Sequence, residues 1–183
     1  FVKSDLRLNS KDIGVSIACD GVCLTLMQIK HKIMEFYDKE FDITIKKDSS
    51  PLTKADLAAN RLITHNLSSI NKNIPILSEE SLVDWNKRKT WTKYWLVDPL
   101  DGTKEFIKKN GEFTVNIALI ENNKPVIGII YLPAKSLLYY AKQNNGSFRI
   151  NTIDRLESLN QAQNIKVKKN PEGDKVRIIG SRS

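Results

Sequence analysis

The chain has 183 residues, 40% of them hydrophobic and 27% charged, and these ordinary fractions exclude a wholly disordered protein. Its 29 basic and 21 acidic residues give a net charge of +8, spread along the chain, which indicates a general affinity for phosphate and no dedicated nucleic-acid surface. No stretch reaches the roughly 20 apolar residues of a membrane-spanning helix, and the polar N-terminus lacks a signal-peptide core, so we expect a cytoplasmic protein.

The N-terminal part of the chain predicts a helix followed by a short strand. Apolar residues recur at helical spacing within residues 15–39, so one face of that helix is expected to be buried. Residues 41–45 alternate between apolar and polar side chains, which is typical of a strand, and residues 49–51 end the strand in a turn.

A second helix follows, capped by Thr53 or Ser50 and ending near residues 68–69. Asp56 lies in its first turn, where the helix dipole alone favours a carboxylate. Asp56 is therefore either a structural acid or a functional one, and the helical pattern does not distinguish the two.

Two short apolar segments then lead to acidic residues. Residues 73–78 form an extended piece that ends at Glu79 and Glu80, and the apolar run of residues 93–97 ends at Asp98. Taken alone, the glutamate pair is typical of a solvated loop. The ends of sheet strands, however, are the usual place for binding groups, so the acids are candidates for one site.

The second half of the chain predicts a short helix and then hairpins. The helix begins at Thr103, two strands within residues 112–134 join at residues 121–124, and another pair turns at Asn145–Gly146. This order favours an α+β fold, with helices packed on a mainly antiparallel or mixed sheet. We expect residues 1–150 to form one α+β domain that binds metal and phosphate, and residues 151–183 to start a second α/β domain that is incomplete.

The segment DPLDGT, residues 98–103, carries the strongest chemical signal. Pro99 fixes φ near −65°, so the backbone turns at once and brings Asp101 back toward Asp98. Two close carboxylates repel each other unless a proton or a cation lies between them, and Mg²⁺ prefers such oxygen ligands. A capped turn without a functional role is the alternative interpretation.

The same segment also predicts the start of a helix. Asp101 is the expected N-cap, and Gly102 would let a ligand approach the backbone. The free amides of Gly102 and Thr103 could then bind phosphate at the positive end of the helix dipole. Metal and phosphate would share one pocket.

Four segments together resemble the 3'(2'),5'-bisphosphate nucleotidases of the CysQ type, which belong to the metal-dependent, lithium-sensitive inositol monophosphatase superfamily. They are KKDSSPLTKAD (46–56), PILSEE (75–80), WLVDPLDGTKEFIKKNGEFTVNIALI (95–120) and GIIYLPA (128–134). DPLDGT alone indicates only the superfamily, and the continuation through NGEFTVNIALI points to the nucleotidase branch. The resemblance implies a layered α/β sandwich of the sugar phosphatase type whose C-terminal part is truncated here.

The resemblance also implies ligands for two or three Mg²⁺ ions in a complete site. Glu79, Asp98 and the Leu100 carbonyl would bind one ion, and Asp98 and Asp101 a second. The second ion would also need the aspartate of a later tryptophan-aspartate motif, and this sequence lacks that motif.

Catalysis and substrate binding are implied by the same resemblance. Asp56 and Thr103 would orient and deprotonate the attacking water, while the amides of Gly102 and Thr103 would hold the phosphate, with Glu79 beside it. Lys46 matches a family lysine near the substrate, although an exposed solubilising lysine is an equal interpretation.

The implied reaction is the hydrolysis of adenosine 3',5'-bisphosphate to AMP and phosphate, which recycles a by-product of sulfate assimilation. The alternatives are an inositol monophosphatase-like phosphomonoesterase and a catalytically weak phosphate-binding fragment. We expect a small nucleotide and no nucleic acid as partner. Peripheral contact with the anionic inner face of a membrane stays open.

Overall fold

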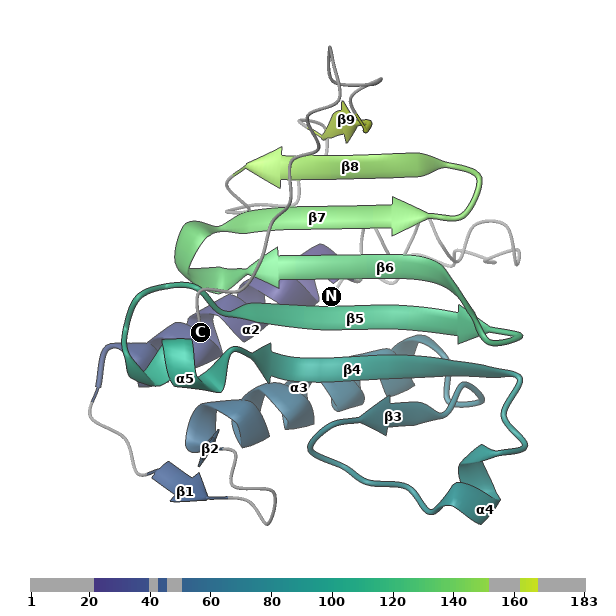
Figure 1. Ribbon diagram of the computed structural model, residues 1–183, viewed down its shortest axis with the longest axis horizontal. Coiled ribbons are helices and arrows are strands. Elements are labelled where there is room, and N and C mark those ends of the chain that lie inside the picture. Colours follow the sequence, from purple (N-terminus) through teal and green to yellow (C-terminus); the bar gives the residue numbers. More distant parts are fainter. Residues whose placement is uncertain (1–21, 40–42, 46–50, 152–161, 168–183) are drawn as a thin grey trace, which may run out of the picture.

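The computed structural model describes residues 22–39, 43–45, 51–151 and 162–167, and every structural statement below refers to these residues. The main sheet strands are β3 (Ile76–Ser78), β4 (Lys93–Asp101), β5 (Thr114–Glu121), β6 (Lys124–Leu132), β7 (Leu137–Lys142), β8 (Gly146–Asn151) and β9 (Gln163–Ile165). They form one seven-stranded sheet in chain order (Figure 1). β3 and β4 are parallel, and each later pair is antiparallel.

Two long helices, α2 (Val22–Tyr37) and α3 (Lys54–Ile70), cover one face of this sheet and lie behind it in Figure 1. Each helix has apolar residues every three or four positions, so each buries one side against the strands. The strands bury one face by a different pattern, in which every second residue faces the helices. The fully buried residues of this core include Leu26, Ile29, Ile33, Ala59, Ile63, Trp95, Val115, Tyr131 and Ile150.

Smaller elements frame the sheet. β1 (Ile43–Ile45) and β2 (Pro51–Thr53) pair antiparallel beside the start of α3, and α5 (Thr103–Ile107) follows the end of β4. α4 (Trp85–Arg88) lies in the connection from β3 to β4, and a 3₁₀ turn, η2 (Pro133–Lys135), links β6 to β7. None of the helices described is long and apolar enough to cross a membrane.

The predicted fold class is confirmed, since helices pack on a mixed and mainly antiparallel sheet. The predicted second helix is also found. Of the two predicted capping residues, Thr53 and Ser50, Thr53 is its N-cap. Leu96, in the apolar run before Asp98, is not buried, although Trp95 and Val97 on either side of it are. The Leu96 side chain is 42% exposed because it points to the face of β4 opposite to Trp95 and Val97.

The sheet continues beyond residue 150, where the sequence places the end of the first domain. β9 pairs antiparallel with β8, with Ser147 opposite Ile165. The segment from residue 168 onward, which is expected to belong to a second domain, lies outside the described residues. The division at residue 150 therefore stays a prediction.

Candidate metal centre

β4 ends in an irregular turn that carries two of the predicted acids. Its pairing with β5 is regular as far as Asp98 and resumes at Asp101, with a register shift between them. Pro99 lies in this gap, where its missing N–H costs no ladder hydrogen bond. The N–H of Leu100 turns back and donates to Oδ1 of Asp98 at 3.3 Å, which holds that carboxylate against the turn.

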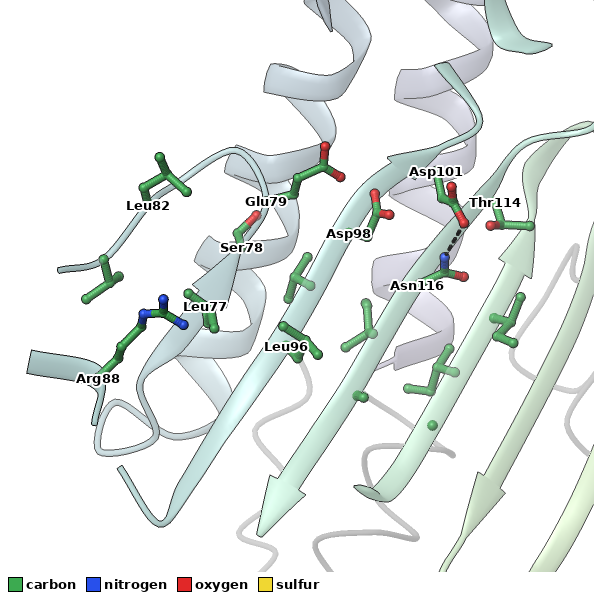
Figure 2. Close-up of a pocket in the computed structure, with 17 residues that line it drawn as sticks. Leu77, Ser78, Glu79, Leu82, Arg88, Leu96, Asp98, Asp101, Thr114 and Asn116 are labelled. Carbon is green, nitrogen blue, oxygen red and sulfur yellow. Dashed lines mark hydrogen bonds between the residues drawn. The ribbon is translucent and has the colours of Figure 1, made fainter. Parts of the chain in front are cut away.

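Three predicted ligands, Glu79, Asp98 and Asp101, line one pocket of about 740 Å³ on the face of the sheet opposite to α2 and α3. Figure 2 shows their carboxyl groups in a row, with Asp98 between the other two. The rest of the pocket is mainly apolar, with Leu77, Leu96 and other strand residues along its floor. The negative charge is therefore gathered at one end of the pocket.

The central carboxyl, Asp98, is strongly perturbed. Burial, the negative charges of Glu79 and Asp101, and a hydrogen bond with Glu79 together raise the pKa of Asp98 to about 7. The backbone N–H of Leu100 opposes this shift but does not cancel it. Asp98 thus holds a proton near neutral pH, at a position where a cation would relieve the same repulsion.

The donor set fits a divalent cation that prefers oxygen. All three side chains are carboxylates, which suits Mg²⁺ with its retained waters. Among the residues that the structure describes, no three His, Cys, Asp or Glu side chains lie close enough to hold one metal ion by themselves. A divalent cation in this pocket would therefore need further oxygen ligands, such as retained waters, beside these carboxylates.

Glu79 owes its position to a buried polar contact between α3 and the segment after β3. Its N–H donates to the Val97 carbonyl at 3.0 Å. On either side of it, Ser78 Oγ donates to Asn60 Oδ1 at 2.8 Å, and Asn60 Nδ2 donates to Ser81 Oγ at 2.8 Å. Asn60 was not singled out from the sequence, although a polar residue on the apolar side of α3 was the available signal.

Asp56 and Thr103, the predicted catalytic pair, are in contact. Thr103 Oγ1 lies 3.2 Å from Asp56 Oδ1 and 3.2 Å from the Leu100 carbonyl oxygen, which are alternative acceptors for its single proton. Asp56 Oδ2 accepts from the Thr53 N–H at 2.8 Å and from Thr53 Oγ1 at 2.5 Å, in a capping box. The structural interpretation of Asp56 is therefore confirmed, and its functional role stays a prediction.

The environment of Asp56 also changes its acidity. Asp56 is buried at 1% exposure, and burial raises its pKa. The hydrogen bonds from Thr53 and Thr103 act in the opposite direction and leave the net shift upward. The carboxyl is thus a better proton acceptor than an exposed aspartate.

The predicted N-cap of α5 is wrong. Gly102 occupies that position, and no side-chain hydrogen bond caps the helix. Asp101 stays in β4, where Oδ2 accepts from Asn116 Nδ2 at 3.1 Å (Figure 2). The bulge after Asp98 places Asp101 beside β5, too early in the chain to cap α5. Asn116 was also missed, because a polar residue on the open face of a strand is common.

Gly102 has a steric reason to be glycine. Its φ of +90° is rare for L residues, and a Cβ there would lie 3.0 Å from the Glu112 carbonyl oxygen. The backbone at the predicted phosphate site is thus pressed against residues 112–113. Lys46, the remaining predicted substrate contact, lies outside the described residues.

A family model for the inositol monophosphatase family matches residues 22–183. This chain belongs to that family. The 3'(2'),5'-bisphosphate nucleotidase CysQ of Salmonella typhimurium is 51% identical over 126 residues, which cover 68% of this chain and 51% of that protein. The CysQ of Haemophilus influenzae is 38% identical over 139 residues, which cover 75% of this chain and 51% of that protein.

A solved structure of another family member has a similar fold. The crystal structure of CysQ from Bacteroides thetaiotaomicron, a bacterial member of the family, superposes with a TM-score of 0.64 at 34% identity. The match covers 92% of this chain and 62% of that one. The family resemblance seen in the sequence is confirmed, and the chain spans about half the length of the curated relatives that it matches.

Proposed function

We propose that this chain carries the metal- and phosphate-binding part of a Mg²⁺-dependent 3'(2'),5'-bisphosphate nucleotidase, which converts adenosine 3',5'-bisphosphate to AMP and phosphate. The proposal is carried by the row of Glu79, Asp98 and Asp101 at one end of a pocket, centred on a carboxyl with a raised pKa. The similarity to proteins named as CysQ nucleotidases supports the choice of substrate.

The residues divide into two ligand sets that share Asp98. Glu79, Asp98 and the Leu100 carbonyl would hold one ion, and Asp98 with Asp101 would hold a second. When the Thr103 proton is directed to Asp56, the Leu100 carbonyl oxygen keeps its lone pairs for a cation. Bound Mg²⁺ supplies positive charge that stabilises the phosphoryl group and lowers the pKa of water in the site.

Thr103 and Asp56 would handle the proton of the attacking water. The Thr103 hydroxyl receives a hydrogen bond from that water while its own proton is directed to Asp56 Oδ1. Because the pKa of Asp56 is raised, this carboxyl can take up the proton as the new P–O bond forms. The bond to the 3' oxygen breaks, and that oxygen takes a proton from solvent.

The phosphate itself would lie at the Gly102–Thr103 turn. The absence of a side chain on Gly102 lets residues 112–113 pack against this turn. The amides of Gly102 and Thr103 are the proposed donors to the phosphate. Glu79 would contribute to phosphate binding as well as to the ion. Lys46 is proposed to add a positive charge there.

The test is phosphate release from adenosine 3',5'-bisphosphate and, separately, from inositol 1-phosphate, each with Mg²⁺ and with EDTA. Asp98→Asn should abolish Mg²⁺-dependent release, whereas Asp38→Asn, which changes an exposed aspartate outside the pocket, should not. Preference for the inositol ester would replace the proposed substrate. Binding of the bisphosphate without release would identify a phosphate-binding fragment.

We also propose a cytoplasmic location, where a soluble nucleotide substrate is available. The distributed charge of +8 is compatible with peripheral contact to anionic lipid. Sedimentation with vesicles that contain anionic lipid, at low and at high salt, would test this contact. Binding that is independent of salt would contradict it.

A further inference from the structure

Asn116 lies next to the carboxylate row and is not one of the proposed ligands. On β5 it is directly opposite Asp98, and it lines the same pocket as the three acids. Its Nδ2 donates to Asp101 Oδ2 at 3.1 Å. Figure 2 shows this contact at the end of the pocket where the carboxylates gather. Asn116 therefore contacts one proposed ligand and faces another.

The orientation of the Asn116 amide follows from its partner. Reversing the amide would place its oxygen against the Asp101 carboxylate, so that two acceptors would meet. The orientation with Nδ2 toward Asp101 avoids this repulsion. It makes the contact a hydrogen bond to a charged group, which is stronger than one between neutral groups.

The other end of the amide is buried without a partner. Asn116 Oδ1 is enclosed, and no donor among the described residues reaches it. An unmet buried acceptor destabilises the folded state, so native structures usually supply a protein group or a water. Because Oδ1 is closed to water, the bond to Asp101 is the side-chain hydrogen bond that the described residues give Asn116.

We propose that Asn116 is a positioning residue of the metal centre, an inference that rests on the proposed function. Its amide NH₂ fixes the Asp101 carboxylate in the direction of the cation. Partners that orient metal ligands in this way typically change metal affinity by about 10–100-fold.

The experiment measures Mn²⁺ binding to the 183-residue chain by titration calorimetry, together with thermal unfolding without metal. Asn116→Ala is compared with Asp101→Asn, with the double variant, and with Thr114→Ala as a matched control. Thr114 lines the same pocket and pairs with Asp101 across the strands. Asn116→Ser, which is too short to reach Asp101, is the second variant if the alanine protein does not fold.

Asn116→Ala should weaken Mn²⁺ binding about tenfold. It should have little further effect in the Asp101→Asn background, because the two residues act as one unit. Thr114→Ala should bind as the unchanged protein does. A merely structural Asn116 would lower the unfolding temperature without metal and leave Mn²⁺ affinity unchanged, which would overturn the inference.

Two further outcomes separate this inference from the proposed function. If Asp101→Asn weakens Mn²⁺ binding and Asn116→Ala does not, the metal centre stands and the role of Asn116 is refuted. If neither variant affects binding, or the unchanged chain binds no Mn²⁺, the proposed metal centre fails and the inference fails with it. Full additivity in the double variant would also refute the positioning role.

Discussion

The hydroxyl of Thr103 at the start of α5 lies 3.2 Å from Oδ1 of Asp56 in the first turn of α3. This contact joins two helix starts that are 47 positions apart in the chain. Asp56 Oδ2 is already used by Thr53 in the capping box, so Thr103 is the partner of the remaining oxygen. The contact thus links the folding of α3 to the turn that would hold phosphate.

Replacing Thr103 by valine removes the hydroxyl at nearly constant shape. We expect a loss of about 1–3 kcal/mol of stability, because Asp56 Oδ1 stays buried without its partner. Phosphate release should fall at least 100-fold, as is usual when a proton-transfer group is removed. Urea unfolding and initial rates measure the two effects, and Thr103→Ser should restore most of both. An active valine variant would show that the hydroxyl takes no part in the reaction.

The raised pKa of Asp98 predicts how stability depends on pH without metal. Between about pH 4 and pH 7 the folded chain keeps a proton on Asp98 that the unfolded chain has released. The stabilisation from this proton is complete below the unfolded pKa and is lost as pH rises through about 7. The unfolding temperature of the metal-free protein should therefore fall across this window, as followed by circular dichroism.

Asp98→Asn provides the control for that pH dependence, since asparagine does not titrate. Its unfolding temperature should be less sensitive to pH in the same window. In the unchanged protein, Mg²⁺ affinity should increase with pH because the ion and the proton compete for one carboxylate. A Mg²⁺ affinity that is constant from pH 5 to pH 8 would contradict this assignment.

Asn60 should be required for the position of Glu79. Asn60→Ala removes two hydrogen bonds from the buried contact with Ser78 and Ser81, and we expect a loss of about 1–3 kcal/mol of stability. Mg²⁺ affinity should fall as well, since the segment that carries Glu79 is released. Asn66→Ala is the matched control, because Asn66 lies on the same helix and bonds only an exposed Gln28.

Calorimetry would measure Mg²⁺ affinity in both asparagine variants. The control should keep the affinity of the unchanged protein and lose less than about 0.5 kcal/mol of stability. If Asn60→Ala lowers stability but binds Mg²⁺ normally, Glu79 is held by its own N–H bond to Val97 and the buried contact is dispensable for the site.

Gly102 and Gly128 form a pair for testing backbone strain. Gly102→Ala places a methyl group at a positive φ and 3.0 Å from a carbonyl oxygen, so we expect a loss of about 2 kcal/mol or more. Gly128→Ala meets nothing within 4 Å and should change stability by less than about 0.5 kcal/mol. Urea unfolding distinguishes the two, and equal stabilities would show that the turn can relax around a side chain.

The sequence predicts the elements of this fold well, because their hydrophobic periods are clear. Asp98 and Glu79 could be placed in one site because both follow apolar strand segments. The N-cap of α5 could not be predicted, since aspartate and glycine are both good caps and the bulge after Asp98 decides between them. Asn60 and Asn116 were missed because their roles depend on partners brought close only by the folded sheet.

The parallel pairing of β3 and β4 has a consequence for the segment between them. Because these neighbouring strands run in the same direction, the chain after Glu79 must run back to the other end of the sheet before β4 begins. This return includes Leu82 and Trp85, which are 92% and 61% exposed, and it carries none of the proposed ligands. Leu82, Val83 and Arg88 of this segment line the pocket, whereas Lys89 and Thr90 are exposed and do not. Residues 89–90 are therefore a natural place to open the chain for new termini or to attach a probe.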